Sequence, residues 1–168
     1  MKPRTVAVDT LIDTISAERH VVEYLLFKLI TLKLLFINDE RRFIERAANE
    51  AERVITGLRQ AEERRDQALQ VVADEWDISA ADLTLTRLAQ ELPAAAAKTC
   101  RELQRSLRGL ADEVEAVLEE NRRLAEGGLN DVRTVLDAVV GSTTGDLYTD
   151  AGRRYRTPAQ PMQLDKAL

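Results

Sequence analysis

The sequence predicts an all-α protein, an elongated antiparallel bundle of three long helices plus one short helix, with a flexible C-terminal tail. Apolar residues recur at alternating three- and four-residue steps over long stretches, which is the period of packed helices. Charged residues make up 32% of the chain and aromatic residues only 4%, and this balance is typical of long helices. We expect a disordered N-terminus at 1–8, a helical bundle at 9–140 and a flexible tail at 141–168.

The first predicted helix covers residues 11–36 and carries a heptad-like seam that only Glu18 interrupts. The seam residues are Leu11, Ile15, Val22, Leu25, Leu29, Leu32 and Phe36. Five further residues widen the apolar surface well beyond this seam: Leu26, Phe27, Ile30, Leu34 and Leu35. We therefore expect a central helix that packs against two or more neighbours, with its lysine stems reaching out between them.

The run VVEYLLFKLITLKLLFI at 21–37 also invites comparison with a membrane span. Lys28 and Lys33 lie inside it, and a lysine near the centre of a bilayer costs roughly 3 kcal/mol. A secretory signal peptide is not expected either, because residues 1–16 contain two aspartates and no apolar core region. These features predict a soluble, cytoplasmic protein.

The second predicted helix runs from about residue 40 to residue 74, and either Asn38 or Asp39 is expected to cap its start. One side of this helix is apolar and rich in alanine, and the other carries arginine–glutamate pairs at i,i+4, which predict a solvated face. Gly57 costs about 1 kcal/mol relative to alanine in a helix, so we interpret it as a close helix crossing.

Capping-box spacing at Ser79 and Asp82 predicts a short helix at 80–91, and Pro93 suits the first turn of the next helix. That last helix is expected to cover 93–140, about 70 Å. Its seam comprises Leu103, Leu107, Leu110, Val114, Val117, Asn121 and Leu124, and its period shifts at Gly127-Gly128. Because this helix is longer than its partners, the apolar surface beyond residue 126 is short of intramolecular contacts.

Asn121 is the one polar residue of this last seam, and two interpretations stay open. A buried asparagine could set the register and choice of partner, as in coiled coils. Alternatively, a slight rotation of the helix would expose its amide to solvent.

Composition and charge exclude several classes of function. The net charge is −5, and residues 9–140 carry −8 with no basic face, which argues against nucleic-acid binding. His20 is the only histidine and Cys100 the only cysteine, so one chain cannot build a zinc site of the His/Cys type. We expect no enzyme activity, no cofactor and no metal.

The order of these features resembles the FlgN family of flagellar export chaperones. The resemblance begins with Glu18 and the Leu25-Leu26 and Leu34-Leu35 pairs, continues through Asn38-Asp39-Glu40, and includes Glu62 and Arg65 in the second helix. It ends with Asn121, the amphipathic stretch 129–139, and Leu147-Tyr148-Thr149-Asp150-Ala151-Gly152. The insertion Trp76–Pro93 and the Gly127-Gly128 pair depart from the family pattern.

The resemblance implies a chaperone that holds the hook–filament junction proteins FlgK and FlgL before type III export. The expected substrate-binding surface comprises Asn121, Leu124, Leu129, Val132, Val135, Leu136 and Val139. In the tail, Tyr148 and Gly152 are the expected contacts for the export gate protein FlhA. The alternative is a structural coiled-coil or adaptor protein that forms a homodimer through the same apolar surface.

Overall fold

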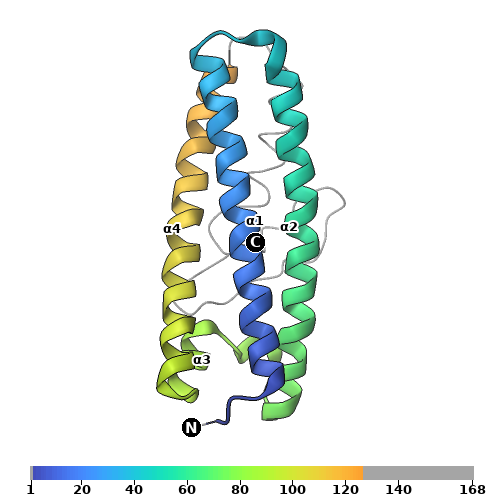
Figure 1. The fold of residues 1–168 in the computed structure, drawn as a ribbon, viewed down its shortest axis with the longest axis vertical. Coiled ribbons are helices and arrows are strands. Elements are labelled where there is room, and N and C mark those ends of the chain that lie inside the picture. The colour runs from blue at the N-terminus through green and yellow to red at the C-terminus, as the bar shows by residue number, and fades with distance from the viewer. Residues whose placement is uncertain (1, 127–168) are drawn as a thin grey trace.

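The computed structural model describes residues 2–126, and it confirms the all-α fold class. Three long helices, α1 (Val6–Ile37), α2 (Arg41–Trp76) and α4 (Ala94–Ala125), run the length of the molecule (Figure 1). A short 3-10 helix, η1 (Ala80–Asp82), and the two-turn helix α3 (Leu85–Glu91) connect α2 to α4. All residues beyond 126, including the predicted tail and the end of the predicted last helix, lie outside the described part of the chain.

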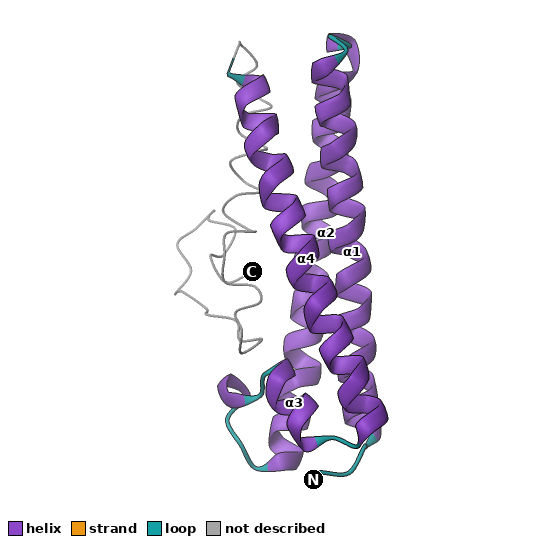
Figure 2. Ribbon diagram, turned by 90° about the vertical axis from the view of Figure 1, so that its left-hand side faces the viewer, coloured by secondary structure: helices purple, strands orange, loops and turns teal. Residues whose placement is uncertain are grey.

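Helix α1 lies between α2 and α4 and packs along both (Figure 1). It runs antiparallel to α2, to which it is joined by a short turn, and parallel to α4. The parallel direction follows from two cross-contacts: Arg19 donates to Ser106 at 3.3 Å and Lys33 to Glu120 at 2.7 Å. Helix α3 packs beside the first turns of α4 at one end of the bundle (Figure 2). The prediction of a central first helix is therefore confirmed.

The start of α1 differs from the prediction, because residues 6–8 belong to its first turn and not to a disordered N-terminus. Thr5 is the N-cap, and its hydroxyl oxygen accepts a hydrogen bond from the Val8 amide at 3.3 Å. The Lys2 amide donates to the Glu91 carbonyl at 2.6 Å, and this bond ties the segment before α1 to the end of α3. The cap removes an unsatisfied amide, and Val8 is fully buried.

The turn between α1 and α2 also differs in detail. Glu40, rather than Asn38 or Asp39, is the N-cap of α2, and no side chain caps that end. Asn38 instead closes α1: its side-chain amide donates to the Leu34 carbonyl at 2.7 Å. Asp39 adopts a left-handed conformation with φ of 53°, which lets the chain reverse.

The predicted short helix at 80–91 is split in two, because Leu83 and Thr84 leave the helical conformation. The Thr84 hydroxyl caps α3 and accepts from the Arg87 amide at 3.1 Å. Pro93 is the N-cap of α4 and not a residue of its first turn. A helix was predicted in both places, but the first is divided at Leu83 and Thr84 and the second begins one residue later than predicted.

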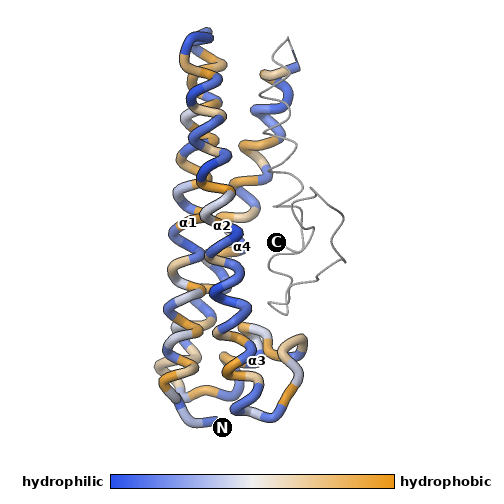
Figure 3. The backbone as a smooth tube through the Cα atoms, turned by 90° about the vertical axis from the view of Figure 1, so that its right-hand side faces the viewer, coloured by the Kyte–Doolittle hydropathy of each residue, from blue (hydrophilic) through white to orange (hydrophobic). Residues whose placement is uncertain are grey.

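Apolar side chains from all four α-helices form one core. The seam of α1 is buried as predicted from Leu11 to Leu32, whereas Phe36 is only partly buried. In α4 the fully buried residue that follows Val114 is Leu118, whereas the predicted seam residue Val117 is only partly buried. Figure 3 shows apolar and polar segments alternating along each long helix. Within residues 2–126, no helix is both long and apolar enough to cross a bilayer.

Gly57 does not mark a close helix crossing. A Cβ atom built on Gly57 would meet no other atom within 4 Å, so the interpretation from the sequence is wrong. The glycine instead lies in α2 beside an open space described below.

Candidate protein-binding site

Only two of the predicted substrate-binding residues, Asn121 and Leu124, lie in the described part of the chain. The other predicted site residues lie outside it: Leu129, Val132, Val135, Leu136, Val139, Tyr148 and Gly152. The two described residues sit one turn apart at the end of α4, but they have opposite environments.

Asn121 has no exposed surface, so the interpretation that its amide bonds to solvent is wrong. Its Nδ2 donates to the backbone carbonyl of Leu29 on α1 at 2.9 Å. Its Oδ1 is buried and has no hydrogen-bond partner among the residues the structure describes. A single polar contact of this kind favours one register between two helices, here α4 against α1.

Leu124, by contrast, is 40% exposed on the last turn of α4. The nearby side chains of Arg123 and Glu119 pair with each other at 3.2 Å. An exposed leucine at this point is accessible to a partner, and it adjoins the sequence stretch 129–139, in which further apolar residues follow.

A second apolar surface, which the sequence analysis missed, lies on the outer side of α1. We call it the α1 apolar face and define it as Tyr24, Phe27, Ile30, Leu34 and Ile37, all of which are at least 36% exposed. Phe27, Ile30 and Leu34 were expected to pack against neighbouring helices, and for these three the prediction is wrong, because neither α2 nor α4 covers them. Phe43, two residues into the adjoining helix α2, is 43% exposed and adds to it.

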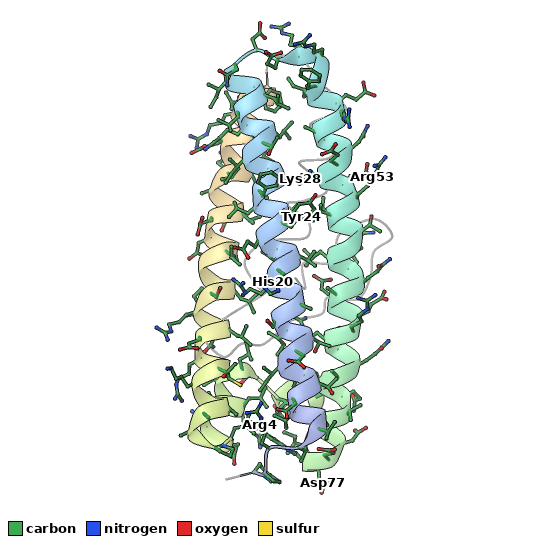
Figure 4. All side chains as sticks on the ribbon, in the orientation of Figure 1. Arg4, His20, Tyr24, Lys28, Arg53 and Asp77 are labelled. Atoms are coloured by element: carbon green, nitrogen blue, oxygen red, sulfur yellow. The ribbon has the colours of Figure 1, made fainter. Side chains whose placement is uncertain are left out.

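An open groove between α1 and α2 adjoins this face and has a volume of about 560 Å³. Val21, Tyr24 and Lys28 line it from α1, and Figure 4 shows Tyr24 and Lys28 on the part of α1 that lies beside α2. From α2 it is lined by Glu50, Arg53, Val54 and Gly57. The absent side chain of Gly57 accounts for part of this space.

Lys28 holds the aromatic end of the α1 apolar face in place. Its Nζ lies 2.8 Å from Glu50, 5.1 Å from the Tyr24 ring centre and 5.5 Å from the Phe27 ring centre. The two rings stack with centres 6.0 Å apart. The Glu50 carboxylate, and after it the Tyr24 hydroxyl, raises the pKa of Lys28, while Lys28 lowers the pKa of Glu50. Because the pKa of Glu50 is lowered, the pair contributes fully to stability at pH values above the ordinary pKa of a glutamate. This contribution is lost as the pH falls through the lowered pKa of Glu50.

Two residues that carried the family resemblance form an ion pair in the bundle interior, and a third, Glu62, is also buried. Arg65 of α2 donates to Glu18 of α1 at 2.9 Å, and their side chains are 7% and 0% exposed. Glu62, one turn from Arg65, is 5% exposed. The residue that breaks the first seam is thus a buried ion-pair partner. Such a pair is sensitive to the loss of either member, because an unpartnered buried charge is costly.

The described residues show no arrangement suited to metal binding. No group of three or more His, Cys, Asp and Glu side chains within 2–126 could hold an ion. His20 is exposed on α1. Cys100 is fully buried, and burial raises the pKa of its thiol to about 11.

An elongated helical body with exposed apolar faces and buried polar contacts defines a helical protein-binding module. The model of the FlgN protein family matches residues 1–156. No curated protein and no solved structure matches the chain. Because the family match covers most of the sequence, the chain belongs to the FlgN family, whose members are flagellar type III export chaperones.

Proposed function

We propose that this protein is a cytoplasmic chaperone that binds FlgK- and FlgL-like hook–filament junction proteins before their type III export. The observation that carries the proposal is the family match over residues 1–156. The described structure is compatible with it, since long helices with accessible apolar residues bind amphipathic partner helices by packing them into a groove.

The proposed substrate surface begins at Leu124, which is 40% exposed, and continues along Leu129, Val132, Val135, Leu136 and Val139. Asn121 is proposed to act from within, by setting the register of α4 against α1, because its amide bonds to Leu29. Covering the terminal helices of an axial protein would prevent them from assembling or aggregating before export.

The test is calorimetric titration of the wild-type protein and a Val132→Ser/Leu136→Ser variant with a junction-protein terminal helix. Removing two apolar contacts should cost roughly 3 kcal/mol, on the order of a hundredfold in affinity. Val71→Ser is a matched control, because Val71 is 52% exposed on α2. Equal affinity for wild type and the double variant would place the substrate surface elsewhere.

The tail is proposed to deliver the substrate through Tyr148 and Gly152, with FlhA as the receptor. An aromatic ring with a hydroxyl group is a common anchor at interfaces. Tyr148→Ala should therefore reduce export of junction proteins while their affinity for the chaperone stays unchanged. Reduced substrate affinity would instead assign Tyr148 to the substrate surface.

The second candidate is an adaptor that dimerises through the same apolar surface, and the exposed Leu124 is compatible with it. Sedimentation equilibrium separates the two candidates. A constitutive dimer that ignores junction-protein helices would favour the adaptor.

A further inference from the structure

Exposed apolar side chains are concentrated in one short part of the molecule. Nine large hydrophobic residues are exposed in the described part of the chain, and six of them lie between residues 24 and 43. The six are the α1 apolar face and Phe43. Single exposed apolar residues are ordinary on protein surfaces, whereas a contiguous patch marks an interaction site.

The shape of this region suits a helix. Residues 24–37 extend about 20 Å along α1, which is between three and four helical turns. The α1–α2 groove runs beside them, and Gly57 leaves space on its α2 side, since a Cβ at this position would meet no atom within 4 Å outside the adjacent backbone of α2. A glycine in the middle of a 36-residue helix is unfavourable, and packing does not explain it here.

The charges around the groove are predominantly positive. A second hollow on α2 adjoins the groove and shares Glu50 and Arg53 with it. The groove and this hollow are together lined by four cationic side chains and two acidic ones. The cationic residues are Lys28, Arg42, Arg46 and Arg53, and the acidic residues are Glu45 and Glu50. The Glu50 carboxylate already faces Lys28 at 2.8 Å and Arg46 at 3.3 Å. Arg53 is exposed and forms no ion pair with any residue in 2–126.

We propose that the α1–α2 groove and the α1 apolar face form a second docking site, which takes an acidic amphipathic helix of a partner protein. The apolar stripe of that helix would cover Tyr24, Phe27 and Leu34, and its carboxylates would face Arg53 and Arg46. The chain has a net charge of −5, and these cationic residues beside the groove, which we call the basic rim, select for acidic partners. Two copies joined rim to rim would bring like charges together, so a second copy of this chain fits less well. The groove is lined by α1 and α2 alone, whereas the proposed substrate surface begins on α4, so the site goes beyond that surface.

The experiment measures fluorescence anisotropy of two labelled helical peptides titrated with the full chain. Each peptide is about 18 residues long, with leucines at i, i+3, i+4 and i+7, and the flanking positions are glutamate in one and lysine in the other. We expect the glutamate peptide to bind about tenfold or more tightly than the lysine peptide, with an affinity that falls as salt is raised.

Two variants probe the groove. Gly57→Leu adds a side chain where a Cβ would have space, and Arg53→Glu reverses the groove cation that has no ion-pair partner among residues 2–126. Each should weaken binding of the glutamate peptide by about tenfold or more. Gly109→Leu and Arg59→Glu are the matched controls: Gly109 is equally open but lies on α4, and Arg59 is exposed on α2 outside the groove. Circular dichroism checks whether all four variants keep their helix content.

Several outcomes would overturn the proposal. These are the absence of binding, equal binding of both peptides, equal loss in the control variants, or a dimer in sedimentation equilibrium that Gly57→Leu dissociates. The last would assign the groove to a second copy. The Val132→Ser/Leu136→Ser variant separates this site from the proposed substrate surface, because it should bind the glutamate peptide like wild type. Loss of peptide binding in that variant would place the peptide on the substrate surface instead.

Discussion

The buried ion pair between Glu18 and Arg65 allows a sharp test of the bundle interior. Arg65→Met removes the charge that faces Glu18 at 2.9 Å and leaves a carboxylate with no exposed surface. Breaking a buried pair from one side costs roughly 3–5 kcal/mol. Domains are stable by about 5–15 kcal/mol, so we expect a loss of roughly a fifth or more of the total. The midpoint of thermal unfolding should fall by on the order of 10 °C.

The assay is urea denaturation at neutral pH followed by circular dichroism, for the single variants and for Glu18→Leu/Arg65→Met. The double variant should be more stable than Arg65→Met, because it also removes the Glu18 carboxylate that Arg65→Met would leave buried without its arginine. Arg59→Met on the exposed side of α2 is the control, and its effect should stay within about 0.5 kcal/mol. A cost below about 1 kcal/mol for Arg65→Met, or a double variant no more stable than the single ones, would refute the reasoning.

Three further predictions concern the core. Leu29→Asp should unfold or aggregate the protein, because an uncompensated carboxylate would replace a fully buried seam residue, and an unchanged thermal melt would show that α1 is not central. Asn121→Leu should raise the free energy of unfolding by about 1–2 kcal/mol, since it removes the buried Oδ1; a less stable variant in urea denaturation would show that its bond to Leu29 matters more. The Cys100 thiol should be inert to a disulfide reagent at about pH 8 when native and react after denaturation, because its pKa is about 11; rapid reaction of the native protein would contradict its burial.

The helices could be predicted from the sequence because their periodicity is local. Residues three and four apart share one face of a helix, so the seam from Leu11 to Leu32 marks the buried side of α1 without knowledge of its neighbours. The same reasoning placed both ends of α2 and the start of α4 within a few residues of their observed positions, whereas the predicted end of the last helix at residue 140 lies outside the described residues. The boundaries moved where one side chain decided them, as with Thr5 and Thr84.

The candidate sites could be predicted only in part. Leu124 was expected at the surface, and it is exposed. Asn121 was singled out as the polar seam residue, but its periodicity alone was equally compatible with solvent exposure. Gly57 was noticed for its helix-breaking cost and was assigned the wrong cause, since an empty space and a close crossing both accept a glycine.

By itself, the sequence determined an all-α protein with three long helices, because helical hydrogen bonds and seams depend on residues close together in the chain. Tertiary structure decided which side of α1 stays uncovered, because that depends on where α2 and α4 pack. It also brought together Glu18 and Arg65, which are 47 residues apart, and Asn121 and Leu29, which are 92 apart. Such contacts arise between separate helices, and no periodicity within one helix specifies them.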